Sequence, residues 1–221
     1  LVRQVFFHCH SMDSVRARER FNGLAALLEK GQLEQQALSL IAGPYLHYPR
    51  HDSVNLTWEF NRPVESRLRV ATSVEESGES GGSVLDKGFP ADGGIQVAEI
   101  DGLDPDTRYF YRIDAVEGKG DSLSTDWLSF QTAVKEEQPF VFAVLGDTES
   151  RPHINEAIGR RIWGERPHFL LVLGDLTDGG FEDDKHQWNL EYFHGISPLA
   201  GRVPVVAVPG NGDSDLFWFN R

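Results

Sequence analysis

The sequence predicts a two-domain protein in which an all-β sandwich is followed by an α/β domain built from βαβ units. From about residue 41 to 134, short runs of alternating apolar and polar residues are separated by turn residues, which is typical of sandwich strands. From residue 139 onward, continuous apolar runs alternate with helical patterns, which is typical of parallel strands joined by crossover helices. The 40% hydrophobic and 25% charged residues are ordinary for a globular protein.

The charge balance excludes some classes of partner. The chain has 34 acidic and 21 basic residues, a formal net charge of −13. Nucleic acids and anionic membranes attract basic surfaces, so we expect neither as the main partner. No apolar run approaches the roughly 18 to 20 residues that span a bilayer. The chain begins at Leu1 rather than Met, so its location stays open, and nothing in the sequence sets an oligomeric state.

Residues 1–40 are predicted to form a helical segment. Between Asp13 and Leu40, apolar residues recur near helical spacing with Glu and Arg between them. The pattern indicates an amphipathic helix that packs against the rest of the protein, and its role is not otherwise indicated.

Residues 41–134 are predicted to form the β-sandwich. Four stretches alternate apolar and polar residues: 53–58, 66–71, 95–100 and 109–115. The polar, glycine-rich stretch 75–82 between them is predicted to be a loop. The charged, proline-ended stretch 133–139 marks the boundary to the next domain.

One corner of this module has a known counterpart. Residues 103–109 read L-D-P-D-T-R-Y and resemble the L-x-P-x-T-x-Y corner of fibronectin type III domains, in which the Tyr hydroxyl bonds back to the preceding backbone. Trp58 on an early strand fits the core aromatic of such a sandwich. Protein or carbohydrate binding is the functional alternative, but no residue marks a site, and we interpret the module as structural.

Residues 139–221 carry the chemistry. Three apolar runs, 141–145, 169–173 and 203–208, are predicted to be strands buried on both faces of a parallel sheet. Helical patterns at about 152–164 and 183–196 connect them. Because the carboxyl ends of parallel strands open on one edge, the residues that follow them are expected to meet there.

Each of these strands ends at a glycine followed by an oxygen ligand. The pairs are Gly146-Asp147, Gly174-Asp175 and, one residue beyond the last run, Gly210-Asn211. Glycine permits sharp turns and close backbone approach. Two carboxylates and an amide oxygen form a hard oxygen site that attracts divalent or trivalent cations. The alternative is that these side chains only cap the helices that follow.

The three motifs, G-D-T, G-D-L-T-D-G-G and G-N-G-D, resemble the first three motifs of calcineurin-like metallophosphoesterases. Residues 43–46, G-P-Y-L, with the fibronectin-like module behind them, resemble the N-terminal domain of purple acid phosphatases. The resemblance covers roughly residues 41–221. It implies that residues 139–221 are the first half of a metallophosphoesterase α/β sandwich, C-terminally incomplete in this chain.

The resemblance implies a dinuclear centre of divalent or trivalent ions, with Fe, Zn or Mn expected. Asp147 would bind one metal, Asp175 would bridge both, and Asn211 would bind the second near the substrate phosphate. In this family a metal-bound hydroxide attacks phosphorus in line. Glu149 stands where many relatives have the His of Asp-x-His, so an oxygen would replace a nitrogen ligand. Asp178 stands where purple acid phosphatases have Tyr, and we count it as a further candidate ligand.

The third motif departs from the family at one position. Gly212 replaces the His that helps to protonate the leaving group, whereas Asp213 matches the acidic position after it. Asp175, Asn211 and Asp213 are therefore the candidate catalytic residues. The later His motifs of the family do not occur before Arg221, and we expect residues 1–221 alone to be inactive.

The predicted function is metal-dependent hydrolysis of phosphoric esters, with a small-molecule phosphate ester as substrate. The first alternative is a degenerate relative that binds metal or phosphate without turnover, as Gly212 would allow. The second is a structural or adhesion protein in which the fibronectin-like module matters most. The resemblance also suggests a secreted or periplasmic location.

Overall fold

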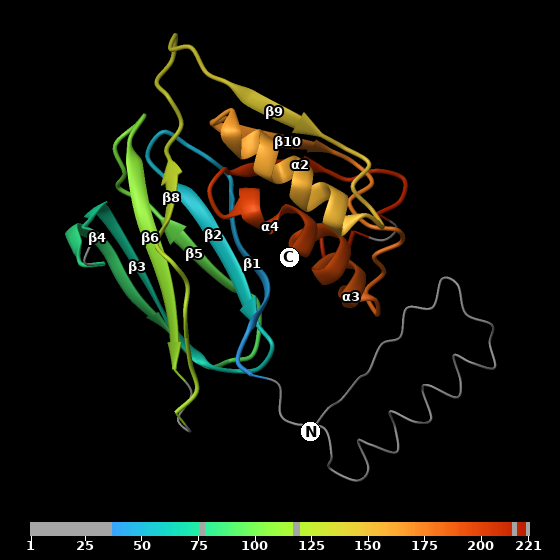
Figure 1. The fold of residues 1–221 in the computed structure, drawn as a ribbon, viewed down its shortest axis with the longest axis horizontal. Helices are drawn as coiled ribbons and strands as arrows, with labels where there is room; N and C mark the ends of the chain where they lie inside the picture. Colours follow the sequence, from blue (N-terminus) through green and yellow to red (C-terminus); the bar gives the residue numbers. More distant parts are fainter. Residues whose placement is uncertain (1–36, 76–77, 117–119, 214–215, 220–221) are drawn as a thin grey trace. The chain divides into compact units, whose positions relative to one another are not determined.

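A computed structural model of the protein describes residues 37–75, 78–116, 120–213 and 216–219 (Figure 1). The predicted helical segment 1–40 therefore lies outside the described residues except for its last four, and Leu40 already belongs to the first strand, β1. None of the helices in the described ranges is both long and apolar enough to cross a membrane.

The N-terminal part is a sandwich of antiparallel strands. One layer has the order β5-β2-β1 and the other β4-β3-β6-β7, with β8 also paired to β6. The bounds are β1 Leu40–His47, β2 Val54–Phe60, β3 Glu65–Val74, β4 Ser80–Phe89, β5 Gln96–Ile100, β6 Arg108–Val116, β7 Ser122–Ser124 and β8 Leu128–Gln131. All four predicted strands are confirmed. The predicted loop 75–82 is shorter than expected, because its last three residues already pair in the β3–β4 hairpin.

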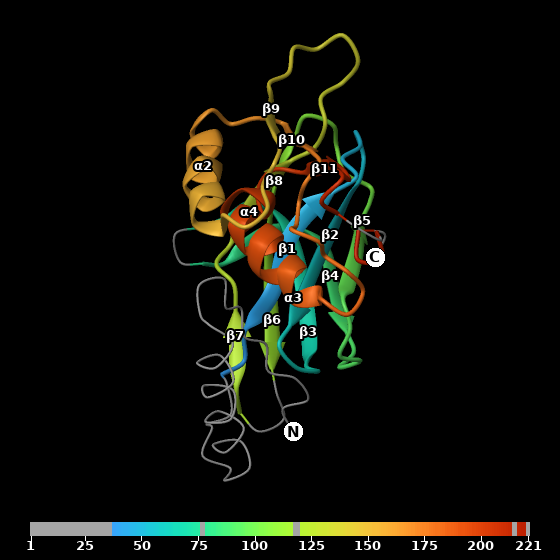
Figure 2. The same ribbon diagram turned by 90° about the vertical axis from the view of Figure 1, so that its right-hand side faces the viewer.

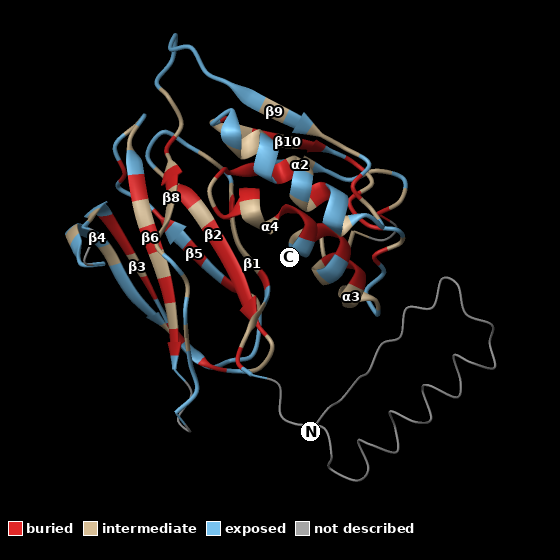
Figure 3. Cartoon of the chain, viewed as in Figure 1, coloured by how far each residue is buried: buried red, intermediate tan, exposed pale blue. Residues whose placement is uncertain are grey.

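Alternation places the apolar residues of both layers in one core (Figure 3). Trp58 is completely buried and meets the Phe89 ring edge-on, with centroids 4.8 Å apart. The Tyr109 hydroxyl accepts a hydrogen bond from the backbone N–H of Asp104 at 2.8 Å. The predicted Tyr corner and core Trp are thus both present.

The C-terminal part contains the predicted parallel strands and the helices between them. The strands are β9 Phe142–Leu145, β10 Phe169–Leu173 and β11 Val205–Val208. Helix α2 spans Pro152–Gly164 as predicted. The second helical region is longer than predicted and runs through α3 Lys185–Gln187, the π-helix η1 Trp188–Phe193 and α4 His194–Ala200.

The two parts share one sheet, which the sequence did not indicate. Strand β11 pairs in parallel with β1, where His47 lies opposite Val205, and the six strands run β5-β2-β1-β11-β10-β9 (Figure 2). The Tyr111 hydroxyl of β6 also donates to the Gly201 carbonyl at 2.6 Å. The domain limits 41–134 and 139–221 remain a prediction, and the sheet crosses them.

The expectation that the parallel strands are buried on both faces is wrong for the described residues. One face packs against α4 and η1 through Leu170 and Val172. The opposite face is between 41% and 55% exposed at Phe142, Val144, Leu173, Val206 and Val208. No segment within the described ranges covers these side chains, so these three strands are covered on one face.

Helix α2 turns only part of its apolar stripe inward: Ile162 and Trp163 pack against the core. Ile154 is exposed, whereas Asn155 and Gly159 are buried. A Cβ added to Gly159 would lie 3.5 Å from the Leu199 Cβ, and one added to Gly195 would lie 3.1 Å from the Asn155 Cβ. Close approach of α2 to α4 at these two glycines therefore sets which face is buried.

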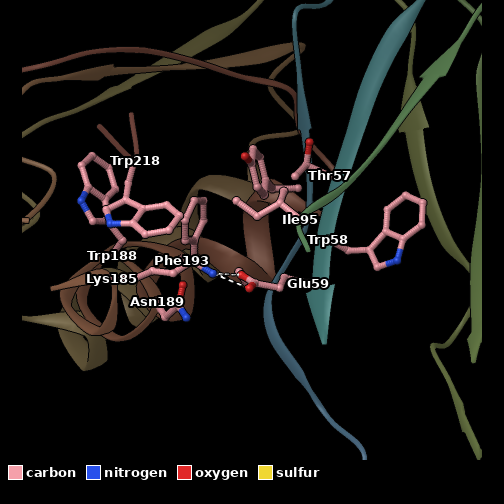
Figure 4. A pocket seen from close by; sticks show the side chains of 11 residues that line it. Thr57, Trp58, Glu59, Ile95, Lys185, Trp188, Asn189, Phe193 and Trp218 are labelled. Atoms are coloured by element: carbon pink, nitrogen blue, oxygen red, sulfur yellow. Dashed lines mark hydrogen bonds and ion pairs between the residues drawn. The ribbon is translucent and has the colours of Figure 1, made fainter. Parts of the chain in front are cut away.

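Figure 4 shows the contact between β2 and the α3–η1 stretch. The Lys185 ammonium pairs with the Glu59 carboxylate and also lies 5.0 Å from the ring centroid of Trp218. The Trp58 side chain points to the other side of β2, into the sandwich core (Figure 4). Neighbouring residues of β2 thus hold the sandwich together and attach the helical stretch to it.

Candidate metal centre

The ends of β9, β10 and β11 bring the predicted motifs to one edge. The three strands are parallel and in register, with Val172 of β10 opposite both Leu145 of β9 and Ala207 of β11. Asp147 and Asp175 follow with positive φ angles of +58° and +50°. A non-glycine residue in this region is strained, and such strain persists where the surrounding structure imposes it, often at functional sites.

Three carboxylates converge at this edge. One oxygen each from Asp147, Glu149 and Asp175 lies within 4.8 Å of the others. Oxygen ligands that bind a cation at about 2.0 to 2.6 Å are separated by up to about 5 Å across the ion. The Glu149 Oε2 atom is buried and has no hydrogen-bond partner among the described residues. The residues therefore fit a metal ion, which would supply the missing partner.

The charge of this group is poorly compensated by the protein. Burial raises the pKa of Glu149, and the like charges of Asp147 and Asp175 raise it further. Asp147 pairs with Arg151 at 3.0 Å, but both side chains are at least half exposed, so the pair is screened by water. A bound cation would relieve the repulsion that remains.

The glycines of the motifs bring the loops close together. Gly174 has a φ of +75°, and a Cβ added to it would lie 2.9 Å from the Gly210 Cα. A Cβ on Gly210 would lie 2.2 Å from the Asp175 Oδ1 atom. The Gly212 N–H donates to the same oxygen at 2.8 Å. The loop after β11 is thus held against Asp175 by its backbone.

Asp213 holds the backbone of these loops. Its side chain is only 2% exposed and accepts hydrogen bonds from the N–H groups of Leu176 at 2.9 Å, Thr177 at 2.9 Å and Gly210 at 2.8 Å. The Thr177 hydroxyl adds a fourth bond at 3.2 Å. With its acceptor positions used in this way, Asp213 joins the loop after β10 to the loop after β11.

The remaining predicted residues lie at the rim. Asn211 is exposed, between two glycines that contact Asp175. Asp178 is also exposed and is not part of the converging carboxylate group. The structure thus brings together three of the five predicted metal ligands and leaves Asp178 outside that group.

Sequence reasoning missed Glu191. This residue lies in η1 and is only 7% exposed, and its carboxylate contacts the loops after β9 and β10. No motif includes it. The available signal was an acidic residue among the apolar residues Leu190, Tyr192 and Phe193.

The part of the chain that contains this site is similar to a known protein family. Residues 140–221 match the family model of calcineurin-like phosphoesterases. The resemblance predicted from the sequence is confirmed. The matched residues include all three strand ends of the phosphoesterase-like part.

Two solved structures share the fold. The structure of PhoD is similar with a TM-score of 0.59 and 15% identity, over 80% of this chain and 40% of that one. The purple acid phosphatase PPD1 from yellow lupin (Lupinus luteus) seeds is similar with a TM-score of 0.56 and 16% identity, over 80% and 35%. The chain thus spans less than half the length of either structure. No curated protein sequence matches the chain.

Proposed function

We propose that the protein hydrolyses phosphoric esters of small molecules with metal ions held at the carboxyl edge of β9, β10 and β11. The single observation that carries this proposal is the convergence of Asp147, Glu149 and Asp175 within 4.8 Å. It occurs inside the part of the chain that matches the phosphoesterase family. Packing alone gives no reason to gather three like charges.

In this proposal Asp147, Glu149, Asp175 and Asn211 would hold two metal ions, with Asp175 as the ligand common to both and Fe, Zn or Mn as the expected metals. Metal ions bound there supply a nucleophile at neutral pH and neutralise charge on the phosphate oxygens. In this proposal the exposed Asn211 amide donates to a phosphate oxygen of the substrate. Asp178 lies exposed at the rim, where its carboxylate could contact the substrate or a metal-bound ligand.

The Gly212 position shapes the expected substrate range. A Cβ added there would lie 3.0 Å from the Thr177 carbonyl oxygen and 3.2 Å from Asp175 Oδ1, tighter than ordinary contacts. The loop is therefore built around a residue without a side chain, and no imidazole at this position can protonate a leaving group. Aryl phosphates, whose leaving groups need little protonation, should react much faster than alkyl phosphates.

The same observation favours a second candidate, a degenerate relative that binds metal or phosphate without turnover. Both candidates require the carboxylate cluster. They differ in whether another group supplies the proton. The location outside the cytoplasm stays a prediction drawn from the family resemblance.

The test uses the longest natural form of the protein that contains this chain. It is loaded in turn with Mn²⁺, Zn²⁺ or iron, its metal content is measured, and aryl and alkyl phosphates are offered. Metal retention with faster aryl hydrolysis is the expected result. Metal without hydrolysis would select the degenerate relative. Absence of both would overturn the proposal and favour a structural role for the fibronectin-like module.

A further inference from the structure

Glu191 connects two of the loops that carry the candidate metal ligands. Its Oε2 atom accepts hydrogen bonds from the backbone N–H of Ser150 at 3.3 Å and of Asp178 at 3.0 Å. Ser150 follows Glu149 directly in the loop after β9. Asp178 lies three residues after Asp175 in the loop after β10. One buried oxygen therefore bridges the segments that hold three carboxylates.

Two residues near Glu191, Gln187 and Trp188, bind the same turn through further hydrogen bonds. The Gln187 side chain accepts from the Gly180 N–H at 2.7 Å and donates to the Asp178 carbonyl. The Trp188 indole donates to the Gly180 carbonyl at 2.7 Å. These contacts come from α3 and η1. They bind both backbone N–H and backbone carbonyl groups of the turn 178–180. The helical stretch is thus fastened directly to the loop after Asp175.

The loops that Glu191 joins contain strained residues. In the loop after β9, Asp147 and Ser150 both have a φ of +58°. In the loop after β10, Asp175 has a φ of +50°. A non-glycine residue in this region is strained and persists where its surroundings hold it. A hydrogen bond to an ionised acceptor is stronger than one to a neutral acceptor. A charged carboxylate is therefore a suitable group to hold these loops.

We propose that Glu191 is a positioning residue for the metal centre, which sets the loop of Asp147 and Glu149 relative to Asp175 without binding the metal. It complements Asp213, which joins the loops after β10 and β11. Together the two buried carboxylates connect all three strand ends in series. This inference rests on the proposed metal-dependent function.

The experiment compares Mn²⁺ binding by the protein and by two variants, using calorimetry. Glu191→Gln removes the charge and keeps the size, whereas Glu191→Asp keeps the charge and shortens the reach. We expect both variants to bind Mn²⁺ about 10- to 100-fold more weakly, the range typical of groups that orient metal ligands. The matched control is Glu156→Gln, which removes a partly exposed carboxylate on α2 that pairs with Arg160. The Mn²⁺ affinity of this variant should differ from that of the unaltered protein by less than about twofold.

Amide hydrogen exchange in metal-free protein gives the second measurement. The Ser150 and Asp178 amides should exchange faster in Glu191→Gln, while that of Tyr111 in the sandwich stays unchanged. Faster exchange at all three amides would indicate general unfolding and overturn a positioning role.

The outcomes separate this inference from the proposed function. If the unaltered protein binds Mn²⁺ and Glu191→Gln binds it equally well, Glu191 is not a positioning residue. If only Glu191→Gln loses affinity while Glu191→Asp keeps it, the effect is one of charge, and positioning is again wrong. If the unaltered protein binds no metal, the proposed function fails, and the exchange of the two amides still decides what Glu191 holds.

Discussion

Acidic residues in the sandwich and at the carboxyl edge of the parallel sheet have different neighbours, and their pKa values shift in opposite directions. In the sandwich, Arg67 pairs with Asp86, and this hydrogen bond lowers the pKa of the Asp86 carboxyl. Asp114 likewise contacts two arginines. At the sheet edge, burial and neighbouring carboxylates raise the pKa of Glu149. These two sandwich carboxylates are paired with arginines, whereas the three carboxylates at the sheet edge lie close to one another and the pair of Asp147 with Arg151 is exposed to water. This difference supports the proposed cation site at the sheet edge.

The comparison predicts that stability and metal affinity respond to different residues. Trp58→Ala should give the largest loss of stability, about 3 to 5 kcal/mol, because it removes a large, fully buried side chain. Metal affinity, measured well below the unfolding transition, should stay unchanged. Chemical denaturation and calorimetry check the two effects.

Trp58→Phe is the matched control for that variant. The Trp58 indole N–H is buried without an acceptor among the described residues, so its removal relieves a desolvation cost. The loss of stability should therefore be clearly smaller than for Ala. Equal losses would show that the ring does not contribute in the way its packing indicates.

The attachment of the helical stretch to β2 should show an intermediate effect. Glu59→Gln leaves the half-buried Lys185 ammonium without its carboxylate. We expect a loss of about 1 to 3 kcal/mol, between the values for exposed and fully buried pairs. The double variant Glu59→Gln with Lys185→Met should recover part of the loss, and an additive loss in the double variant would argue against a direct interaction.

The sandwich should also show a pH dependence. Burial lowers the pKa of His47 from 6.5 to about 4, and its ring bonds to the Thr57 hydroxyl at 2.7 Å. Between these pH values the unfolded chain binds more protons than the folded one. The contribution of His47 is therefore complete above pH 6.5 and is lost as the pH falls toward 4. His47→Gln should flatten the unfolding free energy in this window, and an unchanged slope would assign the dependence to other groups.

Much of the fold could be predicted because the relevant signals are local. Alternation in 53–58 and 66–71 indicated β2 and β3, and the motif L-x-P-x-T-x-Y indicated the corner at Tyr109. The Gly-Asp pairs after apolar runs predicted the cluster of Asp147 and Asp175. In each case a short stretch of sequence carries the physical constraint.

The rest depends on contacts between distant segments. Pairing of β1 with β11 joins residues far apart in the chain, and no local pattern specifies it. Phe142 and Val208 are exposed because no described segment packs over their face of the sheet. A run of apolar residues in the sequence does not show whether another segment covers it. Glu191 and Asp213 act on backbone N–H groups, which every non-proline residue has, so their partners leave no mark on the sequence.

The most direct test of the contrast between the two regions is Mn²⁺ binding by Asp175→Asn beside Asp86→Asn. Each variant removes one negative charge, the first at the sheet edge and the second in a sandwich ion pair. We predict that Asp175→Asn weakens Mn²⁺ binding by at least about 100-fold, more than a group that only orients a ligand, and that it keeps the circular dichroism and the melting temperature of the metal-free protein. Asp86→Asn should bind Mn²⁺ like the unaltered protein. Unchanged affinity in Asp175→Asn, or an equal loss in both variants, would contradict a metal centre at the carboxyl edge of β9, β10 and β11.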